Sequence, residues 1–201
     1  AADAPAGSSG RALGKDDPET ASVVLSALQG EGIAILENTK VVGVEKRGKS
    51  GVRVNVEGPA GSKHVDGTRL LVAAGRAANV NGLDLEKAGI EYDRRGIRIR
   101  SDLRTTNSRV YAIGDVAGSL QFTHMAGYHA GLVVRSILFR LPVRENRAII
   151  PWATFTEPEL AQVGLSEPEA KKSGVPCKIL RWPFSENDRA IAEHKSDGMI
   201  K

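Results

Sequence analysis

The residue of this sequence that most directly indicates ligand binding is an aspartate at the end of a short apolar segment. Residues 110–116 read VYAIGDV, and the apolar run predicts a buried strand that stops at Gly114 and Asp115. A carboxylate buried without donors costs too much free energy, so Asp115 needs hydrogen-bond partners. Hydroxyl groups of a ligand's sugar or polyol chain would suit it. The equally weighted alternative is that Asp115 accepts from backbone N–H groups of its own turn.

A long helical pattern follows this aspartate. Apolar residues recur at helical spacing over residues 121–139, just after Gly118. A strand, an acidic turn and a helix are how an open α/β sheet presents a carboxylate at the edge where its ligands bind. The first-turn N–H groups of such a helix lack internal partners, and the helix dipole favours negative charge beside them.

Composition and charge argue against several classes of protein. The 201 residues carry a net charge of +4, and their basic residues are scattered, which argues against nucleic-acid binding. No apolar run approaches membrane-spanning length, and no histidine spacing indicates a metal site. Cys177 is the only cysteine, which fits a cytoplasmic setting without disulfides. Its place at the start of an apolar run predicts a buried, inert thiol.

Local patterns predict the elements that precede the aspartate. Residues 1–10 read as a flexible tail or linker, and residues 17–19 (DPE) form a helix start. Residues 33–36 predict a short strand, and residues 69–74 (RLLVAA) predict a strand buried on both faces, as in a parallel sheet. Three alternating segments between glycine turns predict an antiparallel meander: 41–46, 52–57 and 63–66.

The sequence changes character after residue 150. Residues 151–156 predict a strand that begins with a proline, and residues 166–169 (SEPE) open a short helix that Gly174 ends. Residues 177–184 predict a further strand. Residues 198–201 read as the first half of one more, which favours a chain that is part of a longer protein.

Four motifs, in this order along the chain, are similar to those of the flavin- and nicotinamide-dependent disulfide oxidoreductases, the family of dihydrolipoamide dehydrogenase, glutathione reductase and mercuric reductase. They lie at 70–79 (LLVAAGRAAN), 105–115 (TTNSRVYAIGD), 155–165 (FTEPELAQVGL) and 187–190 (NDRA). Each motif alone is weak, and their common order carries the resemblance over residues 11–201. Ala78 departs from the pattern, because the family usually has proline there. The segments 121–122 and 128–131 resemble mercuric-reductase-like members most.

The resemblance implies an α/β fold that is part of a flavoprotein with two dinucleotide-binding domains. An antiparallel meander and a parallel-sheet segment would be followed by the start of an α+β dimerisation domain. Residues 11–68 would form the C-terminal part of the NAD(P)-binding domain, and residues 69–147 the closing segment of the FAD-binding domain. Residues 148–201 would form the first, truncated part of the dimerisation domain.

The resemblance also implies where FAD would bind. In the family, the aspartate of the glycine–aspartate pair holds a ribityl hydroxyl, and the glycine lets the backbone approach the ligand closely. The helix that follows points at the flavin pyrimidine ring, where its N-terminus stabilises negative charge on the reduced flavin. The candidate cofactor-binding residues are Gly114, Asp115, Gln121, Phe122, Thr123, His124 and Ala126. A structural role is an equal alternative for His124, and we expect Met125 and His129 to pack in the interior.

The implied function is a reductase that passes electrons from NAD(P)H through FAD to a disulfide, small-molecule or metal-ion acceptor. It would form a homodimer through its C-terminal domain. The 201 residues contain no G-x-G-x-x-G motif and one cysteine, whereas the family has two such motifs and a redox-active cysteine pair. The family's His–Glu acid/base pair would lie beyond Lys201. We therefore expect no catalytic residue, no activity and no FAD retention in these residues alone. The alternative is a non-catalytic binding or dimerisation module, or a pseudoenzyme.

Overall fold

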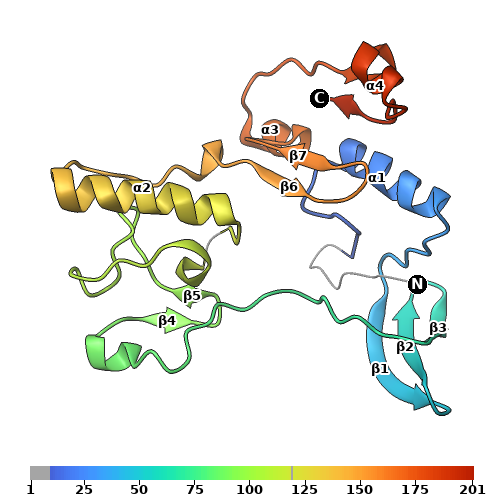
Figure 1. Ribbon diagram of the computed structural model, residues 1–201, viewed down its shortest axis with the longest axis horizontal. Coiled ribbons are helices and arrows are strands. Elements are labelled where there is room, and N and C mark those ends of the chain that lie inside the picture. Colours follow the sequence, from blue (N-terminus) through green and yellow to red (C-terminus); the bar gives the residue numbers. More distant parts are fainter. Residues whose placement is uncertain (1–9, 119) are drawn as a thin grey trace. The chain divides into compact units, whose positions relative to one another are not determined.

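The computed structural model describes residues 10–118 and 120–201, and the chain divides into two compact units. Of the described residues, the first unit comprises 10–74 and Ala153–Lys201, and the second lies within Gly75–Trp152 (Figure 1). Each unit has its own small apolar core. Among the described residues, no helix has the length and apolar character needed to cross a membrane.

Helix α1 (Pro18–Gly30) begins where the sequence predicts. The Asp17 carboxylate accepts the Glu19 N–H at 3.0 Å, which satisfies one of the N–H groups that a helix start leaves unpaired. The helix buries Ala21 and Val24 against Leu160. That leucine opens strand β7 (Leu160–Gln162), which pairs with strand β6 (Trp152–Thr154).

The predicted meander forms the three-stranded sheet of the first unit. Its antiparallel strands are β1 (Lys40–Arg47), β2 (Gly51–Gly58) and β3 (Gly61–Gly67). In its register Val54 lies opposite Val44 on one side and Val65 on the other. Only Val56 of these strands is buried. The sheet therefore depends on its ladder hydrogen bonds and cross-strand pairs more than on a core beneath it.

The rest of the first unit consists of short elements. Helix α3 (Glu167–Ser173) follows Ser166, as the sequence predicts, and its start has a capping box between Ser166 and Glu169. Strands β8 (Trp182–Pro183) and β9 (Met199–Ile200) form an antiparallel pair. The 3₁₀ helix η4 (Phe184–Glu186) and helix α4 (Asp188–Ala192) lie between these strands in the sequence.

The second unit is built around one long helix, α2 (Thr123–Phe139), which begins two residues later than expected. A small hairpin and three single-turn helices accompany it: η1 (Leu85–Ala88), β4 (Tyr92–Asp93), β5 (Gly96–Ile97), η2 (Gly114–Ala117) and η3 (Arg147–Ile149). The core of this unit consists of small and aliphatic side chains: Leu85, Ile90, Ile97, Ala112 and Ala117.

Several predicted strands are wrong. Residues 33–36 and 69–74 form no strand, and of 177–184 only Trp182–Pro183 is a strand. The apolar run before Asp115 makes one isolated bridge, from Tyr111 to Arg104. A strand exists only when a neighbour satisfies its N–H and C=O groups, and the described chain provides no such neighbour at these segments.

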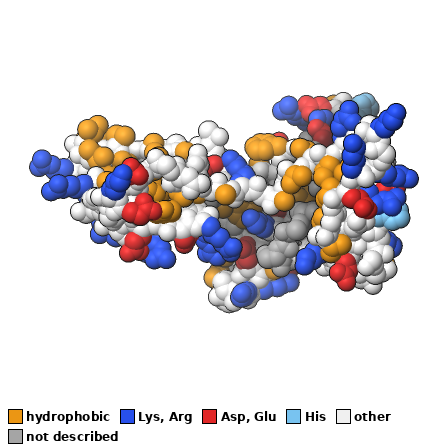
Figure 2. All heavy atoms as spheres, turned by 90° about the horizontal axis from the view of Figure 1, so that it is seen from below, with side chains coloured by type: hydrophobic (Ala, Val, Ile, Leu, Met, Phe, Trp, Pro, Cys, Tyr) orange, Lys and Arg blue, Asp and Glu red, His pale blue; other side chains and the backbone are white. Residues whose placement is uncertain are grey.

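Apolar side chains in these segments consequently lie at the surface. Leu71 is 86% exposed and Val72 76% exposed, although their sequence is that of a buried strand. Cys177 is also exposed, so the predicted buried thiol is wrong. Figure 2 shows hydrophobic side chains among charged ones on the face in view. This much exposed apolar surface is typical of segments that form contacts with further protein.

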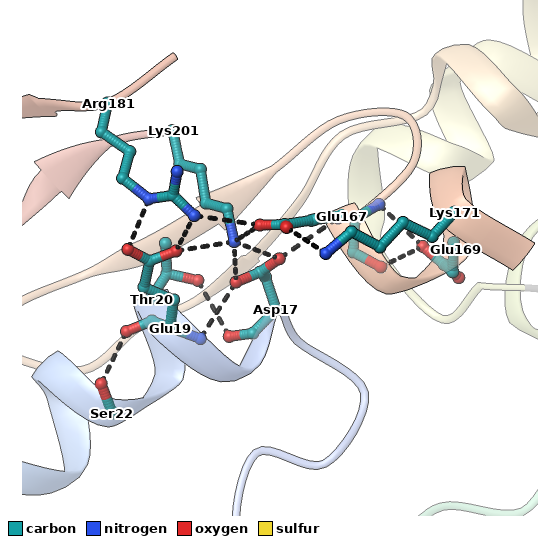
Figure 3. A network of polar contacts seen from close by, with 10 residues as sticks. Asp17, Glu19, Thr20, Ser22, Glu167, Glu169, Lys171, Arg181 and Lys201 are labelled. Atoms are coloured by element: carbon teal, nitrogen blue, oxygen red, sulfur yellow. Dashed lines mark hydrogen bonds and ion pairs between the residues drawn. The ribbon is translucent and has the colours of Figure 1, made fainter. Parts of the chain in front are cut away.

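A cluster of charged side chains joins the start of α1 to later parts of the same unit (Figure 3). This Lys201 cluster consists of Asp17, Glu19, Glu167, Arg181 and Lys201. The Lys201 ammonium lies 2.9 Å from an Asp17 oxygen and 2.8 Å from oxygens of Glu19 and Glu167. The Arg181 guanidinium donates two hydrogen bonds to Glu19 and one to Glu167. Carboxylates that face cations in this way stay ionised far into acid.

We expect the Lys201 cluster to make the stability of the first unit depend on pH. Hydrogen bonds from Arg181 and then Lys201 lower the pKa of Glu19 to about 2, and those from Lys171 and then Lys201 lower the pKa of Glu167 to about 2. Because both values lie below the ordinary 4.5, the stabilisation is complete above pH 4.5 and is lost as the pH falls towards 2. Urea unfolding between pH 7 and pH 2 measures this loss.

The substitution Lys201→Met removes the central cation of the cluster. We expect it to lower the free energy of unfolding at pH 7 and to flatten the dependence on pH below 4.5. Lys195→Met is the matched control, because Lys195 forms a single exposed pair with Glu157 and should change neither quantity. Equal effects of the two substitutions would contradict the assigned role of the cluster.

Candidate functional site

The turn that carries Asp115 is packed closely against helix α2. Asp115 lies in η2, which starts at Gly114 with a left-handed φ of +67°. A Cβ atom on Gly114 would lie 3.0 Å from the Cβ of Ala126 in the second turn of α2. Both the backbone angle and the short distance explain why glycine occupies this position. The structure thus brings together three of the residues that the sequence proposed.

The Asp115 carboxylate has a side-chain partner that sequence reasoning missed. Its Oδ2 accepts a hydrogen bond from Nη2 of Arg76 at 3.0 Å, and Nη1 of Arg76 donates to the Gln121 carbonyl at 3.0 Å. The Asp115 side chain is 45% exposed, and an exposed ion pair of this kind contributes only about 0–1 kcal/mol. A ligand could therefore share this carboxylate at little cost. The signal available in the sequence was the Gly75-Arg76 pair of the first motif.

The start of α2 lies next to this turn and lacks a capping side chain. Phe122 occupies the N-cap position and supplies no side-chain hydrogen bond to the first N–H groups. Its ring stacks on the His124 ring with centroids 5.1 Å apart. Thr123 and His124 are exposed, whereas Gln121 and Phe122 are half-buried. Uncapped N–H groups at a helix start favour a ligand atom that carries negative charge.

His124 and Met125, in the first turn of α2, have defined places in the structure. His124 lies with Nε2 2.6 Å from the Pro151 carbonyl oxygen, so its ring is held by the backbone. This contact gives His124 the structural partner that was one of its two alternatives. Met125 is fully buried, as expected.

His129 is a second residue, after Arg76, whose hydrogen bonds at this site were not predicted from the sequence. Its side chain is fully buried, as expected for a packed residue, but both ring nitrogens also form hydrogen bonds. Nδ1 accepts the Gly114 N–H at 3.0 Å, and Nε2 lies 2.9 Å from a carboxylate oxygen of Glu145. Glu145 is 16 residues later in the chain and belongs to no recognisable motif, so no sequence signal linked the two.

The assembled groups are suited to binding. They offer a carboxylate for hydroxyl groups, a guanidinium, and helix N–H groups for a negatively charged edge. In the part of the chain that the structure describes, no three His, Cys, Asp or Glu side chains are grouped as a metal site would require.

We expect Gly114→Ala to destabilise the second unit. Alanine at a left-handed φ of +67°, with its Cβ forced against Ala126, should lower the free energy of unfolding by about 1–3 kcal/mol. Gly131→Ala within α2 is the matched control, because a Cβ there meets nothing within 4 Å. That change should be neutral or stabilising by about 0.5–1 kcal/mol. Thermal and urea unfolding compare the two, and an equal response would refute the close packing at Gly114.

Comparison with known proteins identifies the family. The profile of the pyridine nucleotide-disulphide oxidoreductases matches residues 8–130, and the profile of their dimerisation domain matches residues 150–201. The chain is 34% identical over 192 residues to a mercuric reductase of Bacillus cereus and 38% identical over 194 residues to a dihydrolipoyl dehydrogenase of Thermus scotoductus. These alignments cover 95% and 92% of this chain, but only 30% and 40% of those relatives.

Solved structures agree with these matches. The HOCl-induced flavoprotein disulfide reductase RclA from Escherichia coli aligns with a TM-score of 0.83 at 26% identity, over 98% of this chain and 44% of that chain. LpdA from Mycobacterium tuberculosis aligns with a TM-score of 0.81 over 91% of this chain and 39% of that chain, and at 24% identity this likeness concerns the fold alone. The expected α/β fold class is confirmed, and the chain belongs to the pyridine nucleotide-disulphide oxidoreductase family.

Proposed function

We propose that this chain is part of a flavoprotein reductase that passes electrons from NAD(P)H through FAD to a disulfide, small-molecule or metal-ion acceptor. Its family and the names of its relatives support this role. The observation that carries the proposal is the placement of the exposed Asp115 carboxylate beside the uncapped start of α2. A polyol hydroxyl and an electron-rich ring edge on one ligand would meet these two features together.

The residues that would hold FAD are those proposed from the sequence: Gly114, Asp115, Gln121, Phe122, Thr123, His124 and Ala126. Asp115 would hold a ribityl hydroxyl, while its Oδ2 is paired with Arg76. The N–H groups at the start of α2 would stabilise the negative charge that reduction adds to the flavin. FAD, when bound, supplies the acceptance of hydride and the onward transfer of electrons. The chain's own residues bind, orient and stabilise charge.

The division of the chain follows the same proposal. Residues 11–68 belong to the NAD(P)-binding domain, 69–147 to the FAD-binding domain and 148–201 to the dimerisation domain. The unit boundaries of the structure, after Ala74 and after Trp152, lie near the limits of the FAD-binding part and support its separation from the segments before and after it. Because the chain contains one cysteine, a thiol-exchange cycle within these residues has no resolving partner. We therefore propose that these 201 residues alone are inactive.

We expect Asp115→Asn to weaken FAD binding by the source-encoded polypeptide, which is the complete protein that the natural gene produces. Loss of a charged acceptor for a ribityl hydroxyl should raise the FAD dissociation constant about 10- to 100-fold. Asp84→Asn is the matched control, because Asp84 is an exposed carboxylate of the same unit, paired with Lys87. Titration of apoprotein with FAD, followed by flavin fluorescence, measures both variants.

Two results would overturn the proposed function. One is a source-encoded polypeptide that binds no flavin, which would favour the non-catalytic dimerisation module. The other is equal FAD affinity in Asp115→Asn and Asp84→Asn. The 201 residues produced alone should be colourless, because one carboxylate and one helix end are a small part of an FAD site.

We also propose that the protein is a cytoplasmic homodimer formed through residues 148–201, without nucleic acid or membrane as partner. The match of residues 150–201 to the family's dimerisation domain supports the homodimer. Light scattering coupled to size exclusion should give twice the mass of one source-encoded polypeptide, unchanged at high salt, because interfaces of lasting dimers are largely apolar. A single-copy mass over the whole range of concentration would contradict it.

A further inference from the structure

A buried hydrogen-bonded chain lies behind the Asp115 turn. It runs from the Gly114 N–H to His129, then to Glu145 and on to Arg147. His129 is fully buried, and the Glu145 side chain is 7% exposed. The Glu145 carboxylate accepts from Nε of Arg147 at 2.9 Å, so its charge is paired where it leaves the interior. Each polar group along the chain has a partner, as buried polar groups require.

The hydrogen bonds fix which nitrogen of His129 carries the proton. The backbone N–H of Gly114 can only donate, so Nδ1 must present its lone pair. The proton then resides on Nε2, which donates to the Glu145 carboxylate. A carboxylate that accepts from one ring nitrogen sets the tautomer and orientation of the ring, and this makes the other nitrogen a directed acceptor.

The hydrogen bond between Gly114 and His129 also constrains the next residue, Asp115. The turn η2 starts at Gly114 and includes Asp115, so the hydrogen bond from the Gly114 N–H to His129 ties the turn that carries Asp115 to helix α2. The close approach of Gly114 to Ala126 limits the turn from the same side. Arg76 constrains the carboxylate itself from the solvent side.

We propose that His129, oriented by Glu145, is a positioning residue that holds the Gly114–Asp115 turn in the geometry that binds the ribityl chain of FAD. The inference rests on the proposed function, because it assigns His129 its task at the FAD site. His129 does not touch the ligand and acts through the backbone of Gly114. An interior histidine that only filled space would need neither the directed Nδ1 acceptor nor a buried carboxylate to orient it.

A double-mutant cycle in the source-encoded polypeptide tests this coupling. His129→Leu removes the acceptor, and we expect it to raise the FAD dissociation constant about tenfold. His129→Gln, whose amide can both accept from Gly114 and donate to Glu145, should restore most of the affinity. Tyr128→Phe is the matched control: it removes a neighbouring hydrogen bond, from the Asn146 N–H to the Tyr128 hydroxyl, and keeps His129 and Glu145, so affinity should stay unchanged.

The decisive readout is non-additivity with Asp115→Asn. If His129 acts by placing Asp115, the double variant His129→Leu/Asp115→Asn should bind FAD almost as well as Asp115→Asn alone. Full additivity, or unchanged affinity in His129→Leu, overturns the inference and leaves the proposed function standing. If His129→Leu does not fold, His129→Asn replaces it, because asparagine keeps the amide but is too short to bridge both partners. Equal FAD affinity in the Asn and Gln variants would then overturn the inference. Absence of flavin from the unsubstituted protein overturns both proposals.

Discussion

The contact between the Gly114–Asp115 turn and helix α2 is the constraint on which the rest of the second unit depends. Gly114 donates its N–H to His129, has a left-handed backbone and lies so close to Ala126 that an added Cβ would come within 3.0 Å of the alanine Cβ. These three restraints act on one residue and leave its neighbour little freedom. An exposed carboxylate on such a turn is preorganised, so ordering it on binding costs little entropy.

The features that local sequence determines were predicted well. The helix starts at Asp17 and Ser166 and the glycine turns of the meander each depend on a few adjacent residues, and all are present. Long-range partners were not predictable in the same way. The Arg76–Asp115 pair joins residues 39 apart, and Glu145 reaches His129 across 16 residues without any periodic pattern.

The incorrect strands have a different cause. Residues 69–74 have the composition of a strand buried on both faces, and composition is all that a single sequence shows. Whether a strand forms depends on neighbours, and the chain spans 30% to 44% of the relatives to which it aligns. Leu71 and Val72 lie exposed for want of such neighbours in the described chain. The family assignment, which depended on motif order and not on pairing, was unaffected.

The two units also differ in the number of chain segments that form them. The second unit is continuous in sequence, whereas the first is assembled from two segments on either side of it. Lys201 and Asp17, which meet in the charged cluster, are 184 residues apart. During synthesis the first unit can close only after the whole of the second has been made. The unit that carries the Asp115 turn has no such delay, because it consists of one uninterrupted stretch of chain.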